Sequence, residues 1–243
     1  MKRILMLGGS MAQVSAIKHA KKLGLEVILC DYLPDNPGQR YADRFYQVST
    51  TDKEAVLQVA IKERINGIVA YASDPAAPTA AYVGNKLSLP SNPYESVVTL
   101  CRKDLFRRFL KENGFNTPKS ESFTRIGDAL DFFHECGDKA IVKPVDSSGS
   151  KGVKIVENDK DLIEAFKKAL EICREQIVVV EQVVDNKYRF VIGGDGFIVN
   201  GDLRVSCLMN CHRDTLCNPL VPVGKSFPPI FEEYELETAN GEI

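Results

Sequence analysis

The first 90 residues alternate between short apolar runs and longer stretches whose apolar side chains recur at helical spacing. Residues 4–7 form an apolar run, a Gly-Gly-Ser turn interrupts it at residues 8–10, and helical spacing covers residues 11–23. A second apolar run follows at residues 26–30. This order predicts a strand, a helix and a second strand parallel to the first, because such crossovers nearly always give parallel neighbours.

The alternation continues to residue 113. The pattern predicts a helix at residues 53–64, a strand at 67–71, a helix at 75–86 and a short strand at 87–90. A Ser-Asn-Pro turn at 91–93 precedes a helical stretch, residues 94–113, with an interruption near Arg102. We therefore predict a doubly wound parallel sheet of the α/β class in residues 1–93 and a helical connection in residues 94–113.

After Gly114 the pattern changes to short strands around one amphipathic helix. Strands are predicted at residues 140–144, 154–156 and 177–184, and the helix at residues 159–175. This is typical of a small α+β module, which we place at residues 114–184. Residues 185–243 form a further segment, with strands at 197–199 and 203–208, a loop at Asn218-Pro219 and an acidic tail from residue 231.

Composition narrows the class of partner. The 243 residues are 44% apolar and carry a formal charge of −2, with both signs mixed along the chain. Such a chain has no basic surface for nucleic acid or an anionic membrane, so small-molecule substrates are favoured. No apolar run reaches the roughly 20 residues that span a bilayer. Seven cysteines, an odd number, predict reduced thiols and a cytoplasmic location.

A loop of small residues lies between two predicted strands, from Asp146 to Val153. Its glycines let backbone N–H groups approach phosphate oxygens closely, and its lysine adds positive charge. No helix follows, so this is not a Walker loop, and the loop would cover phosphates as a hairpin lid. A flexible hairpin tip is the alternative. The candidate phosphate-binding residues are Ser147, Ser148, Gly149, Ser150, Lys151 and Gly152.

Two flanking strands carry polar residues among apolar ones. Lys143 ends the apolar run before the loop, where its ammonium group would bind an anion or remain solvated at a strand edge. The later run contains Glu181 and Gln182, followed by Val183 and Val184. Exposed backbone at this point could bind the edge of an adenine ring.

The order of these motifs resembles the ATP-grasp superfamily. The resemblance rests on Lys103-Asp104 at a helix start, residues 114–118, Val142-Lys143-Pro144, the Ser/Gly loop and Val180-Glu181 after a helix. The N-terminal crossover unit looks like the pre-ATP-grasp domain of that superfamily. Within it, the chain is closest in style to carbamoyl-phosphate synthase large subunits and biotin carboxylases. The resemblance covers essentially all the residues.

The resemblance implies an ATP-dependent ligase that forms an acyl phosphate from a carboxylate or bicarbonate and passes it to an amine or similar nucleophile. Lys103 and Lys143 would contact the α- and β-phosphates, the Ser/Gly loop would close over the triphosphate, and residues 181–184 would frame the adenine. This division is physically reasonable, because phosphoryl transfer needs positioning and charge neutralisation above all.

Two departures from the family pattern stand out. Tyr188 occupies the place of the usual ribose-binding acid, for which Asp185 could substitute. The glutamate and Glu-x-Asn ligands that the family uses for Mg²⁺ have no match after Asn218, so we predict no metal-binding residues here although the family uses Mg²⁺. By this comparison the fold is incomplete at its C-terminus. A fragment, a split system with a complementary subunit, and a non-catalytic nucleotide-binding protein all remain open, as does a homo-oligomer.

Other motifs are weaker. Gly8-Gly9-Ser10 with Asp31 imitates a dinucleotide-binding turn but lacks the G-x-G-x-x-G spacing, so an NAD-linked oxidoreductase is a minor alternative. The resemblance instead implies that four residues at the carboxyl edge of the predicted parallel sheet face the acceptor substrate. It also implies that two more residues lie in a loop near that substrate. These are Gly9, Ser10, Ser73 and Asp74, then Arg213 and Asn218. The Cys and His residues between 207 and 217 match no standard zinc spacing.

Overall fold

The structure, a computed structural model, describes residues 1–184, 190–214, 216 and 218–241. It divides into two compact units, Met1–Phe109 and Leu110–Ile243. The four-part division expected from the sequence is finer than this one and stays a prediction.

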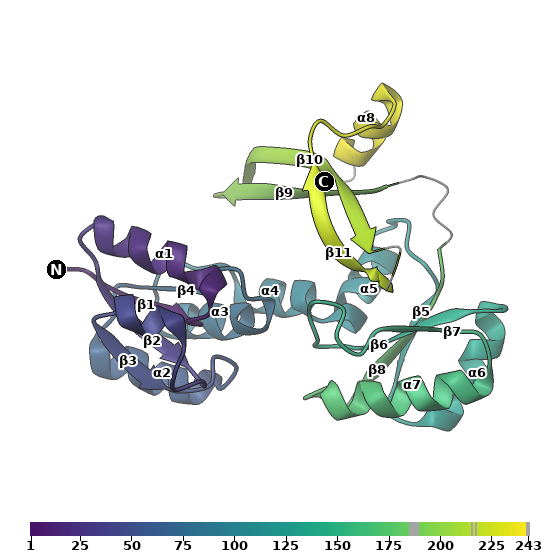
Figure 1. Cartoon of the computed structure of the whole chain (residues 1–243), viewed down its shortest axis with the longest axis horizontal. Helices are drawn as coiled ribbons and strands as arrows, with labels where there is room; N and C mark the ends of the chain where they lie inside the picture. Colours follow the sequence, from purple (N-terminus) through teal and green to yellow (C-terminus); the bar gives the residue numbers. More distant parts are fainter. Residues whose placement is uncertain (185–189, 215, 217, 242–243) are drawn as a thin grey trace. The chain divides into compact units, whose positions relative to one another are not determined.

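The first unit is built on a four-stranded parallel sheet in the order β3-β2-β1-β4 (Figure 1). Its strands are β1 (Arg3–Leu7), β2 (Glu26–Asp31), β3 (Arg44–Gln47) and β4 (Gly67–Val69). The change of direction between β2 and β4, on either side of β1, makes this a doubly wound sheet, as the sequence predicts. β3 has only two apolar residues between polar ones, Arg-Phe-Tyr-Gln, so its sequence predicts no strand.

Helices cover both faces of this sheet. Because side chains alternate along a strand, Met6 packs with Ile17 of α1 (Met11–Lys22), whereas Leu5 and Leu7 pack on the other face. The latter face is covered by α2 (Lys53–Glu63) and α3 (Ala77–Lys86). Short 3₁₀ helices lie at Pro37–Tyr41 and Asp74–Ala76. This two-sided cover produces a core of fully buried aliphatic side chains.

Two expectations for the end of this unit had different outcomes. The break near Arg102 is confirmed, since its extended backbone (φ −96°, ψ 121°) separates α4 (Tyr94–Cys101) from α5 (Lys103–Glu112). The short strand at 87–90 is wrong. Leu87 caps α3 by donating its N–H to Val83 O, and Ser88 adopts a left-handed backbone, so this segment turns back onto the helix instead of extending.

The second unit contains a mostly apolar antiparallel sheet in the order β5-β8-β6-β7. The strands are β5 (Ser120–Phe123), β6 (Ala140–Pro144), β7 (Lys154–Val156) and β8 (Val178–Gln182). Helices α6 (Ile126–Cys136) and α7 (Asp159–Ile172) pack on one face, around Phe133 and Phe166. The predicted α+β module is confirmed, although β5 and α6 were not predicted.

A second antiparallel sheet follows, in the order β11-β10-β9. It comprises β9 (Val191–Val199), β10 (Asp202–Asp214) and β11 (Asn218–Ser226), and α8 (Glu233–Gly241) comes after it. Asn218 begins β11, so the loop expected at Asn218-Pro219 is wrong. The acidic tail is partly helical, because its glutamates at the start of α8 suit the positive end of a helix dipole.

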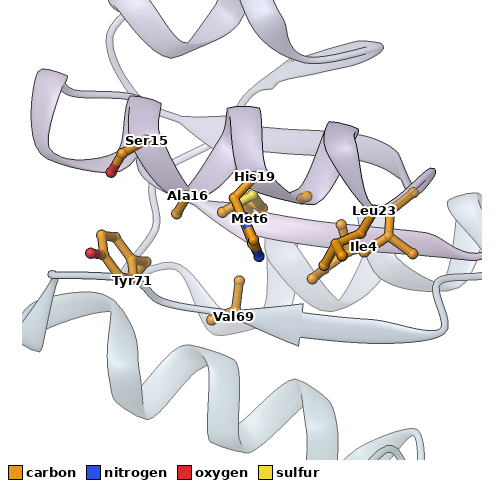
Figure 2. A pocket seen from close by; sticks show the side chains of 10 residues that line it. Ile4, Met6, Ser15, Ala16, His19, Leu23, Val69 and Tyr71 are labelled. Carbon is orange, nitrogen blue, oxygen red and sulfur yellow. The ribbon is translucent and has the colours of Figure 1, made fainter.

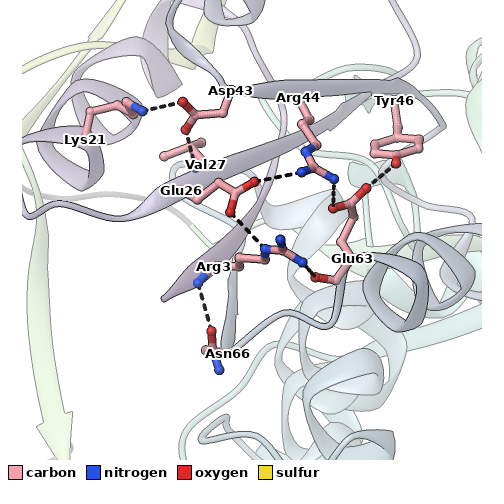
Figure 3. Close-up of polar contacts among 9 residues, drawn as sticks. All are labelled: Arg3, Lys21, Glu26, Val27, Asp43, Arg44, Tyr46, Glu63 and Asn66. Atoms are coloured by element: carbon pink, nitrogen blue, oxygen red, sulfur yellow. Dashed lines mark hydrogen bonds and ion pairs between the residues drawn. The ribbon is translucent and has the colours of Figure 1, made fainter. Parts of the chain in front are cut away.

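An ion-pair network fixes the amino-terminal ends of the strands in the first sheet (Figure 3). Arg44 Nη1 donates to Glu63 Oε2 at 2.7 Å, Tyr46 donates its hydroxyl to the other oxygen of Glu63, and Arg3 Nη1 donates to the Glu63 carbonyl at 2.8 Å. Glu26 accepts from Arg3 at 2.8 Å. The hydrogen bond from Tyr46, then that from Arg44, and the positive charges of Arg44 and Arg3 hold the pKa of Glu63 below its ordinary value. The network ties α2 to three strands.

Within the described residues, no helix combines the length and the apolar character needed to cross a membrane.

Candidate nucleotide site

The most informative polar pair lies on the face of the second sheet opposite α6 and α7. Val142 and Val180 point into the helix-covered core, so Lys143 and Glu181, each one position along its strand, point to the other face. Lys143 Nζ donates to Glu181 Oε1 at 2.5 Å, and the side chains are only 12% and 6% exposed. The sequence assigned these residues to phosphate and adenine separately; the structure brings them together.

A buried ion pair of this kind needs an explanation beyond stability. Burying two charges costs about as much as their attraction returns, so apolar residues would stabilise this sheet equally well. The pair does place a fixed ammonium group at the end of β6, where the chain enters the Ser/Gly loop. Beyond Gln182 the ladder of β8 ends, so the backbone of Val183 and Val184 lies outside the sheet.

The Ser/Gly loop, residues 147–152, leaves the sheet between β6 and β7 with an unusual backbone. Gly149, Ser150 and Gly152 have φ values of +64°, +59° and +71°, in the left-handed region. A side chain at Gly152 would also meet Pro144 and Ile172 at 3.0 Å. Left-handed residues on either side of Lys151 give that part of the loop the alternating backbone of anion-binding loops, and the N–H of Lys151 itself donates to Ser148 O at 3.4 Å. Lys151 is exposed at the tip.

Asp146 anchors the base of the loop and was not predicted as a site residue. Its carboxylate accepts from the backbone N–H of Arg174 at 3.0 Å and of Glu175 at 3.3 Å, and Arg174 Nη2 donates to the Asp146 carbonyl at 3.0 Å. The turn after α7 thereby fixes where the loop starts. An aspartate directly after a strand and before a Ser/Gly run is the sequence signal that could have identified it.

Lys103 begins α5 in the first unit, next to an ion pair between Arg102 and Asp104 at 2.7 Å. Lys143 belongs to the second unit. The joint contact of the two lysines with one triphosphate therefore stays a prediction.

The carboxyl edge of the first sheet is held together by its own hydrogen bonds. Asp31 accepts from Gly9 N at 2.7 Å through one oxygen and from Leu33 N at 2.8 Å through the other, and it is 7% exposed. A side chain at Gly9 would lie 1.9 Å from Asn36 Oδ1. Asp31 is thus occupied and the glycine is needed for internal packing, which argues against a nicotinamide dinucleotide at this turn.

Gln13 links the two halves of this edge. Ser10 caps α1 and bonds to Gln13 Oε1, while Gln13 Nε2 donates to the carbonyl groups of Tyr71 at 2.9 Å and Ala72 at 3.2 Å. The Ser10 turn is therefore brought next to the segment leading to Ser73 and Asp74. Gln13 was missed by the sequence analysis, although Ser10-x-x-Gln13 is the pattern of a capping box.

The remaining predicted residues lie in the second unit. Arg213, near the end of β10, donates from Nη1 to Leu220 O at 3.2 Å, and the backbone of Asn218 pairs with Asp214. Asp185, Tyr188 and Cys217 lie outside the described residues. Across the described part of the chain, no group of three or more His, Cys, Asp or Glu could hold a metal ion. Burial raises the pKa of the Cys30 thiol to about 12, so that cysteine is no nucleophile.

A cavity of about 450 Å³ lies between α1 and β4 (Figure 2). Its wall is mainly apolar, with His19, Ser15 and Tyr71 as the polar side chains. None of the predicted site residues lines it. It belongs to the first unit alone, and the chemistry of a triphosphate, which needs cations and N–H donors, does not match it.

Comparisons with known proteins bear on this geometry. Residues 101–192 match the family model described as phosphoribosylglycinamide synthetase, ATP-grasp (A) domain. A formate-dependent phosphoribosylglycinamide formyltransferase from Salmonella schwarzengrund is 31% identical over 198 residues, which are 78% of this chain and 49% of that protein. The chain spans about half the length of the curated relatives it matches.

Solved structures agree on the fold. An L-amino acid ligase from Bacillus licheniformis superposes with a TM-score of 0.79 at 22% identity, covering 100% of this chain and 58% of the ligase. The biotin carboxylase domain of 2-oxoglutarate carboxylase from Hydrogenobacter thermophilus, solved with MgADP, ADP and bicarbonate, gives 0.74 at 14% identity, covering 99% and 56%. At these identities the likeness concerns the fold alone. The resemblance found in the sequence is confirmed: residues 101–192 belong to an ATP-grasp domain, and the chain has the fold of the ATP-grasp superfamily.

Proposed function

We propose that this chain is the nucleotide-binding part of an ATP-dependent ligase. The reaction would convert a carboxylate, or bicarbonate, into an acyl phosphate and transfer the acyl group to an amine or similar nucleophile, as in carbamoyl-phosphate synthases. The observation that carries the proposal is the Lys143–Glu181 pair at the point where β6 enters the Ser/Gly loop. ATP supplies the phosphoryl group and the driving force of such a reaction.

The chain's own residues would bind and orient the nucleotide. Lys143 offers an ammonium group already fixed by Glu181, which lowers the entropy lost on binding a phosphate oxygen. Lys103 would add a second positive charge. The N–H groups of the Ser/Gly loop would bind the remaining phosphate oxygens and exclude water. Residues 181–184, at and beyond the end of β8, would frame the adenine.

The acceptor would lie at the carboxyl edge of the first sheet, where ligands bind in open α/β sheets. Gly9 and Ser10 are held next to the segment before Ser73 and Asp74 through Gln13, so these four residues would face one small molecule. Arg213 and Asn218, in the second unit, are the remaining candidates for contact with the acceptor. A cytoplasmic setting is part of the proposal and rests on the six described cysteines, which are free thiols.

The experiment is a calorimetric titration of the chain with ATP and Mg²⁺. Lys143→Ala should weaken binding by about 1.5 to 3 kcal/mol, the range for a hydrogen bond to a charged group. The matched control is Lys154→Ala. Lys154 lies in the same sheet opposite Val142, hence on the helix-covered side, where it approaches Asp161 at 4.0 Å. Equal affinity of wild type and Lys143→Ala would remove Lys143 from the site.

A further inference from the structure

The tip of the Ser/Gly loop contacts the second antiparallel sheet of its unit. Ser150 Oγ donates a hydrogen bond to the carbonyl oxygen of Leu220, on β11, at 2.8 Å. Arg213 Nη1, on β10, donates to the same oxygen at 3.2 Å. We call this arrangement of Ser150, Leu220 and Arg213 the tip contact. It joins residues 70 positions apart in the chain.

The backbone of Ser150 indicates that the tip contact does more than fill a surface. Ser150 has φ +59°, a left-handed conformation that costs free energy in a residue with a side chain. Strained residues persist where surrounding contacts hold them, and they gather at switch regions. Ser150 is held by the hydrogen bond of its hydroxyl to Leu220 and by a turn bond, in which its carbonyl oxygen accepts from Val153 N at 3.3 Å.

Base and tip of the loop are held by different sheets. Asp146 fixes the base to the turn at Arg174 and Glu175, which leads into β8, the neighbour of β6 in its sheet. Ser150 fixes the tip to β11. Breaking the tip contact would thus free the tip without disturbing the Asp146 anchor or the core beneath it. The loop could then open by pivoting about its base.

We propose that the tip contact holds the Ser/Gly loop in place before nucleotide binds, with Arg213 as a positioning residue for that loop. The chemistry of its donors suits this role. Hydroxyl and guanidinium groups are typical ligands of phosphate oxygens, and here both donate to one neutral carbonyl oxygen. A triphosphate would compete with Leu220 for them. This last step rests on the proposed function; the holding of the empty loop does not.

Trypsin cleavage after Lys151 tests the proposal without nucleotide. Lys151 is exposed next to Ser150, and cleavage of a loop that opens rapidly follows the population of its open form. Ser150→Gly removes the hydroxyl while favouring the same backbone, so cleavage into fragments 1–151 and 152–243 should accelerate about two- to tenfold, the effect of one hydrogen bond. Mass spectrometry identifies the fragments.

Two matched variants separate the tip contact from general loosening. Ser148→Gly adds a glycine to the same loop but leaves Ser150 intact, and it should change the rate less than Ser150→Gly. Arg213→Gln should accelerate cleavage, whereas Arg204→Gln, on the same strand and paired with Asp202 at 2.8 Å, should not. Circular dichroism melting checks that each variant is folded.

Equal rates for Ser150→Gly and Ser148→Gly would overturn the tip contact as a holding device. An Arg213→Gln rate equal to that of Arg204→Gln would remove Arg213 from it. Because all these rates are measured without nucleotide, they do not depend on whether ATP binds. Repeating the wild-type digestion with ATP then tests the competition: protection of Lys151 supports it, and an unchanged rate contradicts it.

Discussion

The two helix-covered sheets of this chain treat their polar residues in opposite ways. In the first unit, helices cover both faces and the polar groups at the carboxyl edge are bonded to one another, as Asp31 is to Gly9 and Leu33. In the second, helices α6 and α7 cover one face only, and the other carries the Lys143–Glu181 pair. A two-sided core favours a rigid support, whereas in the second sheet the face opposite the helices combines a buried ion pair with a small apolar cluster that includes Val145 and Val179.

This difference explains why a glycine-containing turn after a strand indicates a phosphate site in one unit and not in the other. Gly9 and Gly149 both lie in glycine-containing turns after a strand, yet Gly9 is packed against Asn36 while Gly149 has open space around its α-carbon. Glycine is thus required by packing at the first position and by the left-handed backbone at the second. Only the second leaves room for a phosphate.

The largest effect is expected when packing is removed from the helix-covered face of the second unit's first sheet. Phe166→Ala deletes a side chain that is 2% exposed between α7 and the sheet and should cost about 3 to 5 kcal/mol of unfolding free energy in urea. The control is Ile141→Ala on the opposite face, where the side chain is half-buried and the loss should be smaller. Equal losses of unfolding free energy in the two variants would mean that both faces of this sheet contribute equally to its core.

A smaller effect is expected at the amino edge of the first sheet. Glu63→Gln weakens the bonds from Arg44 and Tyr46 and should cost about 1.5 to 3 kcal/mol near neutral pH. The pKa of Glu63 is lowered from 4.5, so its stabilisation is complete above about pH 4.5 and is lost as the pH falls through the folded pKa. Urea unfolding of both proteins at several pH values measures this.

The wild type should therefore lose stability on acidification more steeply than Glu63→Gln. Parallel pH curves for the two proteins would show that Glu63 does not titrate as the network requires.

The smallest effect is expected from substitutions at the two glycines. Gly9→Ala forces a methyl group against Asn36 and should lower stability by about 1 to 3 kcal/mol, as overpacking does. Gly149→Ala meets only the penalty of its left-handed backbone, about 1 kcal/mol. Thermal unfolding compares the two. A larger loss at Gly149 would show that its loop belongs to the core, contrary to the division drawn here.

Much of the fold could be predicted because its signals are local. The apolar run at β1, the turn after it and the spacing in α1 each follow from neighbouring residues. β3 and β5, which begin at Arg44 and Ser120, were not predicted because neither contains an apolar run. These short strands form by pairing with β2 and β8. Such pairing joins distant segments and leaves little trace in a local pattern.

The candidate site could be predicted only in part. Lys143 and the Ser/Gly loop follow one another in sequence, so their proximity was predictable. The bond between Lys143 and Glu181 spans 38 positions and depends on the register of β6 against β8. The anchors at Asp146 and Gln13 contact backbone groups of remote turns, and sequence spacing does not encode which backbone group a side chain will reach.

The register of β6 against β8 limits how the length of this chain can vary. Inserting or deleting one residue within β6 would turn Lys143 toward Phe133 and Phe166 and place Val142 beside Glu181, because a shift of one position exchanges the two faces of a strand. Such a change would destabilise the core and remove Lys143 from the candidate nucleotide site. Between Ser147 and Gly152 the chain has no such ladder, so changes of length there would alter the ligand contacts and spare the core.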